Sequence, residues 1–274
     1  MRLIADGGST KIDWLLTDDE GKRLMHTSVG LNPTMLSADE IVDGLRRVAE
    51  EWPPMVDAKT IEFYGAGCTP VASEKMAEAL RTVIAGAETV TVGSDIIGAA
   101  KALLGDEEGI ACILGTGACS CHWGRKADGS VGIVSQTPAL GYILGDEGSG
   151  AVLGRLMINA MYKGVLPRSI CDEFERAYDV DMYGVIEHVY RMPQPNRWLA
   201  SLSPFVHSHM DNEQVAKLVC ENLRAFFVRN ILPYGRMDLP VSFVGSIAYY
   251  YEEQLRIEAE KLGVKIGVIR KSPL

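Results

Sequence analysis

Short apolar runs alternate with amphipathic segments along this chain of 274 residues, a pattern typical of an α/β protein. The apolar runs predict strands over 2–6, 11–17, 23–29, 61–64, 89–92, 110–114, 118–123, 131–135, 241–244 and 265–270. Helical spacing predicts helices over about 38–51, 70–85, 95–104, 148–162 and 246–262, and a mostly helical segment over 169–232. Ser94 is the expected cap of the third helix, and Ser37 with Glu40 has the spacing of a capping box.

The order of these elements occurs twice. In each copy a short strand leads through a glycine turn into a second strand, at 6–11 and again at 114–117. A shift of 109 residues aligns three identical residues of the two copies: Gly8 with Gly117, Trp14 with Trp123 and Asp19 with Asp128. The repeat predicts a duplicated α/β architecture with domains at 1–104 and 105–274, a cleft between them, and a helical insertion in the second.

The paired glycine turns are the strongest chemical signal in the chain. Without a Cβ atom, a glycine turn lets backbone N–H groups approach phosphate oxygens closely. A single turn of this kind is as easily an ordinary hairpin. The second copy, in the same strand context, favours two phosphate-binding turns that hold a nucleotide from both sides of the cleft.

Charge and composition exclude several classes of partner. The net charge of −9 argues against nucleic acid and anionic membranes, which bind basic surfaces. No apolar stretch approaches the ~20 residues of a membrane span, and the first residues do not form a signal peptide, so we expect a cytoplasmic protein. Cys119, Cys121 and His122 suggest a metal site, but on a strand His122 points away from the two thiols, which favours buried small side chains.

Six segments in this order resemble the sugar kinase/Hsp70/actin superfamily and, within it, the N-acetylglucosamine kinase and BadF-type ATPase family. They are D-G-G-S-T-K at 6–11, G-L-N at 30–32, S-D at 94–95, L-G-T-G at 114–117, L-G-D-E-G-S at 144–149 and V-G-S-I-A at 244–248. The resemblance covers essentially the whole chain. It implies a duplicated actin-like ATPase (ribonuclease H-like) fold, ATP-dependent chemistry in the interdomain cleft, and a homodimer.

The resemblance also implies a role for individual residues. Asp6 would hold Mg²⁺ through water, and Asp95 matches the family's catalytic base. The first phosphate loop would contain Gly8, Ser9, Thr10 and Lys11, and the second Gly115, Thr116 and Gly117. Gly245 and Ser246 would lie beside the adenosine of ATP, while Asn32, Gly141 and Asp146 match positions that contact the sugar. Cys119 departs from the family, whose sugar kinases usually carry asparagine there.

The chemistry of these residues agrees with the resemblance. Phosphorylation of an alcohol needs a carboxylate that accepts the hydroxyl proton, and Mg²⁺ that neutralises the transferred charge. Asp95 follows a strand and opens a helix, where side chains project toward a cleft, although a helix start also favours an acid through the macrodipole. Asp146 and Glu147 could equally be a solvated helix start or a pair that binds vicinal hydroxyls.

The favoured function is ATP-dependent phosphorylation of a sugar hydroxyl, with an N-acetylated amino sugar such as N-acetylglucosamine as the acceptor. The alternative is an ATPase that activates a partner enzyme, like the activators of 2-hydroxyacyl-CoA dehydratases and benzoyl-CoA reductase. Those activators hold an iron–sulfur cluster through cysteines, and this chain has no C-x-x-C. A filament protein or a non-catalytic sugar sensor is disfavoured because Asp6 and Asp95 are both present.

Overall fold

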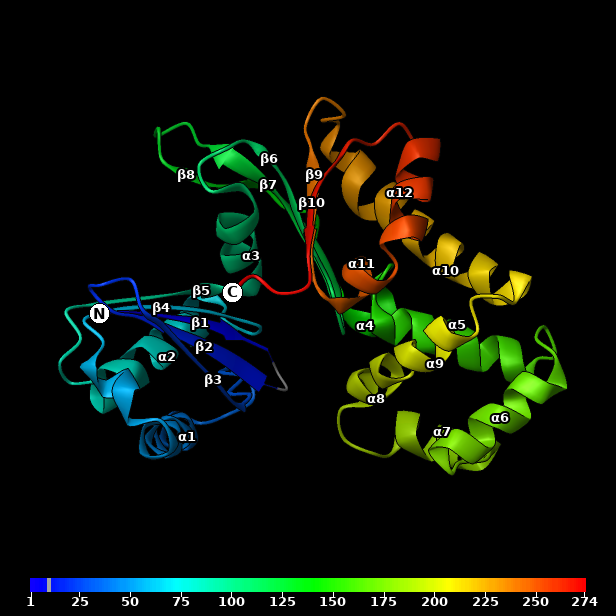
Figure 1. Ribbon diagram of the computed structural model, residues 1–274, viewed down its shortest axis with the longest axis horizontal. Helices are drawn as coiled ribbons and strands as arrows, with labels where there is room; N and C mark the ends of the chain where they lie inside the picture. Colours follow the sequence, from blue (N-terminus) through cyan, green and yellow to red (C-terminus); the bar gives the residue numbers. More distant parts are fainter. Residues whose placement is uncertain (9–10) are drawn as a thin grey trace. The chain divides into compact units, whose positions relative to one another are not determined.

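Two five-stranded mixed sheets organise the chain (Figure 1). The computed structural model describes residues 1–8 and 11–274 and divides into two units. The first unit is Met1–Ala102 with Pro273–Leu274, and the second is Leu103–Ser272. Leu103 and Leu104 therefore group with the second unit, and the last two residues group with the first.

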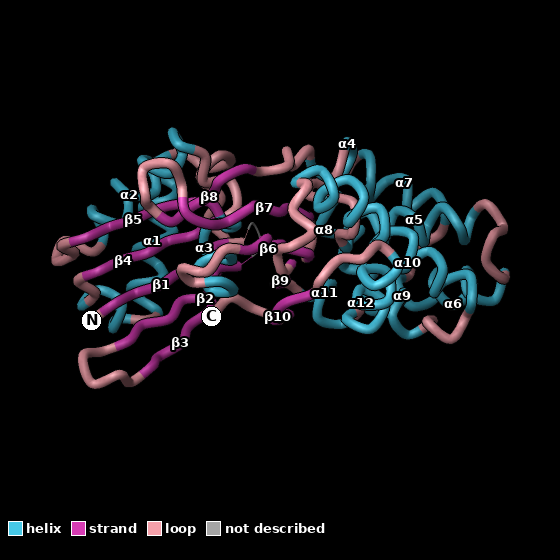
Figure 2. Tube along the Cα trace, turned by 90° about the horizontal axis from the view of Figure 1, so that it is seen from above, coloured by secondary structure: helices cyan, strands magenta, loops and turns pink. Residues whose placement is uncertain are grey.

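The first sheet has the strand order β3-β2-β1-β4-β5, and Figure 2 shows its strands side by side. Its strands are β1 (Arg2–Gly7), β2 (Lys11–Thr17), β3 (Arg23–Val29), β4 (Thr60–Gly65) and β5 (Thr89–Ser94). The first three strands are antiparallel neighbours, whereas β1, β4 and β5 run parallel. The carboxyl ends of β1, β4 and β5 therefore meet at one edge of the sheet, the edge at which α/β proteins bind ligands.

Helices cover the first sheet on both faces: α1 (Ala38–Glu51), the short 3₁₀ helix η1 (Pro53–Asp57), α2 (Pro70–Val83) and α3 (Asp95–Leu104). Figure 1 shows α1 and α2 on one side and α3 on the other. Alternate residues of β1 and β2, such as Leu3 and Trp14, pack in a core with α1 and α2. The predicted capping box is confirmed, because Ser37 and Glu40 bond reciprocally at the start of α1.

The second sheet has the strand order β10-β9-β6-β7-β8. Read from β8, this order repeats that of the first sheet, because β8, β7, β6, β9 and β10 correspond to β3, β2, β1, β4 and β5. Its strands are β6 (Gly109–Leu114), β7 (Ala118–Arg125), β8 (Val131–Ser135), β9 (Val241–Val244) and β10 (Ile266–Arg270). The strands β6 and β7 form an antiparallel hairpin, as β1 and β2 do, and β6, β9 and β10 are parallel. The predicted duplication is therefore confirmed.

The residue-by-residue alignment of the two copies was wrong. Gly7 pairs with Ile12 around the first turn, and Leu114 pairs with Ala118 around the second. The equivalent residues thus differ by 107 positions in the first strand (114 − 7) and by 106 in the second (118 − 12), not by 109. Trp14 packs in the helix-covered core, whereas Trp123 lies outside the corresponding core and donates its indole N–H to Gly105. The match between the two tryptophans was a coincidence of the chosen shift.

The helices of the second unit lie on one side of its sheet and extend beyond it (Figure 1). They are α4 (Gly141–Leu144), α5 (Gly150–Tyr162), α6 (Arg168–Tyr178), α7 (Met182–Tyr190), α8 (Pro195–Ser201), α9 (Ser203–Ser208), α10 (Glu213–Phe226), α11 (Ser246–Tyr250) and α12 (Glu252–Lys261). A π-helical turn, η2 (Phe227–Ile231), and a 3₁₀ turn, η3 (Leu232–Tyr234), follow α10. Tyr251 divides the predicted helix 246–262 into α11 and α12. Within the described residues, no helix has the length and apolar character that crossing a membrane would require.

Candidate functional site

The predicted base, Asp95, and the predicted magnesium-binding residue, Asp6, lie at the carboxyl edge of the first sheet. In the parallel register, Gly7 of β1 is opposite Gly65 of β4, which is opposite Ser94 of β5. Asp6 is the penultimate residue of β1, and Asp95 follows β5 directly as the first residue of α3. The strand order therefore brings Asp6 and Asp95 to one edge of the sheet, although 89 positions (95 − 6) separate them in the sequence.

The electrostatic environment favours the protonated form of both carboxyl groups. Burial, together with the negative charges of Asp95 and Asp13, raises the pKa of Asp6 to about 6, and the positive charge of Lys11 opposes this shift. Burial also raises the pKa of Asp95, against the hydrogen bond that the Ile96 N–H donates to its Oδ1 at 2.9 Å. A carboxylate with a raised pKa is a stronger base than an ordinary aspartate, which suits a group that accepts a proton.

Asp13 is a residue that the sequence analysis missed. It lies opposite Asp6 in the β1–β2 register, and its carboxylate accepts hydrogen bonds from Lys11 Nζ at 2.5 Å and Thr27 Oγ1 at 2.8 Å. The signal was available, because alternate residues of a strand share one face, so Lys11 and Asp13 had to lie together. The predicted loop residue Lys11 is thus held next to the two acids.

The first glycine turn is closed by a hydrogen bond from the Gly8 N–H to the Lys11 carbonyl at 2.8 Å. The two predicted loop residues between them, Ser9 and Thr10, lie outside the described residues. The phosphate-binding role of Gly8 and Lys11 stays a prediction.

Asn32 lies beside the loop that follows β4. Its Oδ1 accepts hydrogen bonds from the N–H and the hydroxyl of Thr34, at 3.0 and 2.6 Å. A Cβ atom at Gly67 would come within 2.2 Å of the same oxygen, so this close contact requires glycine there. The side chain of Asn32 is therefore fixed by its own turn, and its contact with a sugar stays a prediction.

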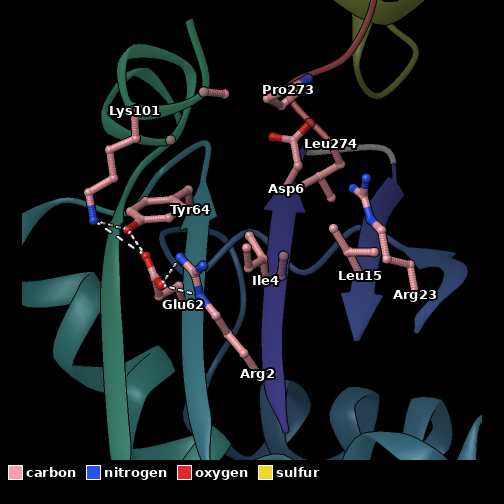
Figure 3. Close-up of a pocket in the computed structure, with 13 residues that line it drawn as sticks. Arg2, Ile4, Asp6, Leu15, Arg23, Glu62, Tyr64, Lys101, Pro273 and Leu274 are labelled. Atoms are coloured by element: carbon pink, nitrogen blue, oxygen red, sulfur yellow. Dashed lines mark hydrogen bonds and ion pairs between the residues drawn. The ribbon is translucent and has the colours of Figure 1, made fainter. Parts of the chain in front are cut away.

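A pocket of about 230 Å³ lies along the face of the first sheet that α3 covers, from Arg2 to Asp6 (Figure 3). Glu62 binds the guanidinium of Arg2 at 2.5 Å on one side of the pocket, and the hydroxyl of Tyr64 donates to Glu62 at 2.6 Å. Lys101 of α3 in turn donates to the Tyr64 hydroxyl at 2.5 Å. This network ties β1, β4 and α3 together along the pocket that Asp6 also lines.

The second glycine turn is attached to a helix in the second unit. The Gly115 N–H donates to the Gly117 carbonyl at 3.0 Å, and Thr116 at the tip is exposed. The first amides of α5 donate to the turn: Gly150 to the Gly115 carbonyl at 2.8 Å and Ala151 to the Thr116 carbonyl at 3.1 Å.

Asp146, predicted to contact the sugar, lies against this second turn. Its Oδ1 accepts a hydrogen bond from the Ala118 N–H at 3.3 Å, and its Oδ2 is 3.1 Å from the place of a Cβ atom at Gly117. Burial raises the pKa of Asp146, the Ala118 N–H opposes this shift, and the charge of Glu147 adds to it. The structure therefore brings together a predicted phosphate loop and a predicted sugar contact.

The remaining predicted residues of the second unit lie near the same turn. Gly245 follows β9 with φ +125°, and a Cβ atom there would lie 2.2 Å from the carbonyl oxygen of Leu114, the residue before the turn. Ser246 is exposed and begins α11. Gly141 is exposed and begins α4, and its carbonyl accepts the N–H of Gly145, the residue before Asp146.

The carboxylates of the first unit fit a magnesium ion of the kind that the resemblance implies. Among the described residues, no group of three or more histidine, cysteine, aspartate or glutamate side chains could enclose a metal ion. Mg²⁺ is usually bound by one or two carboxylates, several waters and the phosphates of its substrate, and does not need such a group. Asp6 is a hard oxygen donor in a locally acidic environment, which matches this pattern.

The segment with Cys119, Cys121 and His122 lies on β7. The ring of His122 hydrogen-bonds to the carboxylate of Glu108 at 2.8 Å.

Comparison with known proteins identifies the family. No family model matches the chain, and no curated protein matches it. The structure of a protein named "Putative N-acetylglucosamine Kinase" from Porphyromonas gingivalis is 43% identical, with a TM-score of 0.94 over 100% of this chain and 95% of that chain.

Two more distant structures show the fold alone. A protein of the same name from Chromobacterium violaceum is 17% identical, with a TM-score of 0.73 over 97% of this chain and 93% of that one. The ethanolamine utilization protein EutJ from Carboxydothermus hydrogenoformans is 14% identical, with a TM-score of 0.57 over 97% and 84%. The fold is the predicted duplicated actin-like ATPase fold, and the chain belongs to the N-acetylglucosamine kinase-like family of the Porphyromonas gingivalis protein.

Proposed function

We propose that this protein is an ATP-dependent sugar kinase whose acceptor is an N-acetylated amino sugar such as N-acetylglucosamine. The observation that carries the proposal is the pair Asp6 and Asp95 at the carboxyl edge of the first sheet, in a chain 43% identical to a protein named as such a kinase. The raised pKa of Asp95 suits a general base, and the acidic environment of Asp6 suits a magnesium–nucleotide complex.

In the proposed reaction, the sugar hydroxyl gives its proton to the Asp95 carboxylate as its oxygen bonds to the γ-phosphorus of ATP. The bond from that phosphorus to the oxygen of the leaving ADP breaks, so charge and atoms balance. Mg²⁺, when bound near Asp6, neutralises the charge of the transferred phosphoryl group. Lys11 and the N–H groups of the glycine turns orient the phosphates, and Asp146 binds a hydroxyl of the sugar.

A screen of sugar acceptors with coupled detection of ADP tests the proposal. We expect N-acetylglucosamine or N-acetylmannosamine to give a higher kcat/KM than glucose. A higher kcat/KM for glucose or for a non-sugar alcohol would reject the amino-sugar assignment. The absence of ADP release with every sugar would reject the kinase itself.

Removal of the Thr116 hydroxyl tests the second turn as a phosphate loop. Thr116→Val keeps the shape of the side chain and removes its donor, and the exposed position leaves the core unchanged. We expect the KM for ATP to rise by roughly tenfold, the effect of one lost hydrogen bond to a charged group. The control is Thr82→Val on α2, where the hydroxyl bonds only to the Glu78 carbonyl. An unchanged KM and kcat in Thr116→Val would mean that the second turn is an ordinary hairpin.

We also propose that the protein works as a homodimer in which two copies of α7 pack antiparallel. Tyr183, Ile186 and Tyr190 form an exposed apolar stripe on this helix. In an antiparallel pair centred on Ile186, Asp181 before the helix lies beside Arg191 of the other copy, which gives opposite charges at both ends.

Light scattering of the Ile186→Glu variant tests this interface. We expect the mass of a dimer for the unaltered protein and of a monomer for the variant, because the two glutamates would face each other. Val165→Glu, at an exposed apolar residue outside α7, is the control. A monomeric unaltered protein, or a dimeric Ile186→Glu variant, would contradict the proposal.

A further inference from the structure

A buried asparagine holds the turn that carries Asp146. Asn222 lies on α10 and is only 3% exposed. Its Oδ1 accepts the Gly148 N–H at 2.9 Å, and its Nδ2 donates to the Ser149 carbonyl at 3.2 Å. Because a buried amide is costly unless its polar atoms are bonded, both ends of this side chain are committed to the turn.

The π-helical turn η2 makes a second attachment to the same segment. Arg229 donates to Glu147 Oε1 at 3.0 Å, and Asn230 donates to Glu147 Oε2 at 3.4 Å. These residues are neighbours in the sequence, yet both side chains reach one carboxylate. Irregular turns of this kind often occur at functional sites. Three consecutive residues, 147–149, are thus tied to α10 and η2.

The conformation of Asp146 depends on this attachment. Its φ of +55° is in the left-handed region, which is uncommon for a residue with a Cβ atom and persists only when the surroundings fix it. The carboxylate of the same residue accepts a hydrogen bond from Ala118, the first residue of β7, which directly follows the second glycine turn. The contacts therefore form a continuous series: α10 and η2, the segment 147–149, Asp146, and the second glycine turn.

We infer that Asn222 and Arg229 are positioning residues that hold the Asp146 carboxylate between the sugar and the second phosphate turn. This inference rests on the proposed function. A hydroxyl that binds Asp146 bonds to a group already attached to the phosphate turn, so the sugar and the nucleotide influence each other's binding through Asp146. Neither Asn222 nor Arg229 touches a reacting atom, and both act through the turn.

The test combines kinetics with amide hydrogen exchange in the full-length protein. In Asn222→Ala we expect the KM for the sugar to rise about tenfold, more than the KM for ATP, because a buried turn loses two hydrogen bonds. Exchange should become faster in residues 145–150 and also in residues 114–119, which contact them through Asp146, the start of α5 and the side chain of Leu114. In the unaltered protein, saturating sugar should lower the KM for ATP, and this effect should weaken in the variant.

Two controls separate positioning from general destabilisation. Asn212→Ala removes the N-cap of the same helix, where Asn212 Oδ1 accepts the Gln214 and Val215 amides, and should lower Tm without faster exchange in 114–119. Arg229→Ala changes an exposed side chain and decides the question if Asn222→Ala does not fold. Its control is Arg256→Ala, which breaks an ion pair with Glu252 on α12, away from this turn.

The outcomes are distinct. Unchanged exchange in 114–119 and an unchanged sugar KM in both Asn222→Ala and Arg229→Ala would overturn the inference. If the unaltered protein phosphorylates no sugar but Asn222→Ala still speeds exchange in 114–119, the proposed function fails while the attachment of the turn stands.

Discussion

Asp95→Asn is expected to lower kcat by at least about 10²-fold while the dissociation constants of sugar and ATP change little. The amide keeps the size of the side chain and can still accept the Ile96 N–H, but it cannot take the hydroxyl proton. The lost interaction would be one made chiefly in the transition state, so kcat and kcat/KM should fall together. Steady-state kinetics with the best sugar of the acceptor screen measures the effect.

The control distinguishes a base from an ordinary acid at a helix start. Asp39 is an exposed acid in the first turn of α1 and has the same favourable relation to its helix dipole. Asp39→Asn should alter stability slightly and leave kcat unchanged. If Asp95→Asn also kept kcat within a few-fold of the unaltered protein, Asp95 would be a helix-start residue and Asp146 the next candidate for the base.

Gly245→Ala is expected to destabilise the second unit by more than ~3 kcal/mol. The new methyl group would lie 2.2 Å from the Leu114 carbonyl oxygen and 2.7 Å from its carbon, and backbone atoms cannot rotate away as a side chain can. The φ of +125° is unfavourable for alanine as well. Since Leu114 leads directly into the second glycine turn, we expect the KM for ATP to rise together with the loss of stability.

Gly235→Ala provides the matched comparison. Gly235 also has a positive φ, +65°, but nothing lies within 4 Å of the place of its Cβ atom. The free energy of unfolding of this variant should fall by only about 1 kcal/mol, because of backbone strain. Thermal unfolding of both variants measures the difference, and equal shifts in Tm would show that the backbone of Leu114 moves aside without cost.

The sequence predicted the parts of the site that depend on strand order. Asp6 lies next to the end of one strand and Asp95 directly follows another, and parallel strands of an α/β sheet place such residues at one edge. The repeated order of elements was enough to predict the two matching sheets. Only the alignment within the repeat failed, because the hairpins have turns of different length and identical tryptophans lay at a misleading spacing.

The residues that the sequence did not indicate act through contacts distant in the chain. Asn222 is 74 positions from Gly148, and nothing in a helical pattern marks one polar residue on a buried face as a partner for a remote turn. The π-helical turn is equally hidden, because the pattern of Phe227–Ile231 fits the continuation of an ordinary α-helix. Asp13 differs from these residues. Alternation along the predicted strand already places Asp13 on the same face as Lys11, so their contact could have been predicted.

The attachment of the second glycine turn to α5 has a consequence for the rate at which the proposed nucleotide would bind. The carbonyl groups of Gly115 and Thr116 are occupied by the first amides of α5, and this helix is anchored in the core through buried residues such as Leu153 and Met157. These hydrogen bonds fix the turn within the fold itself, so in the proposed function a phosphate would not bear the entropic cost of ordering a loose loop. In the proposed function, ATP should therefore associate with this turn at a rate close to that of diffusional encounter. Variants of the turn should then differ in nucleotide affinity mainly through their dissociation rates.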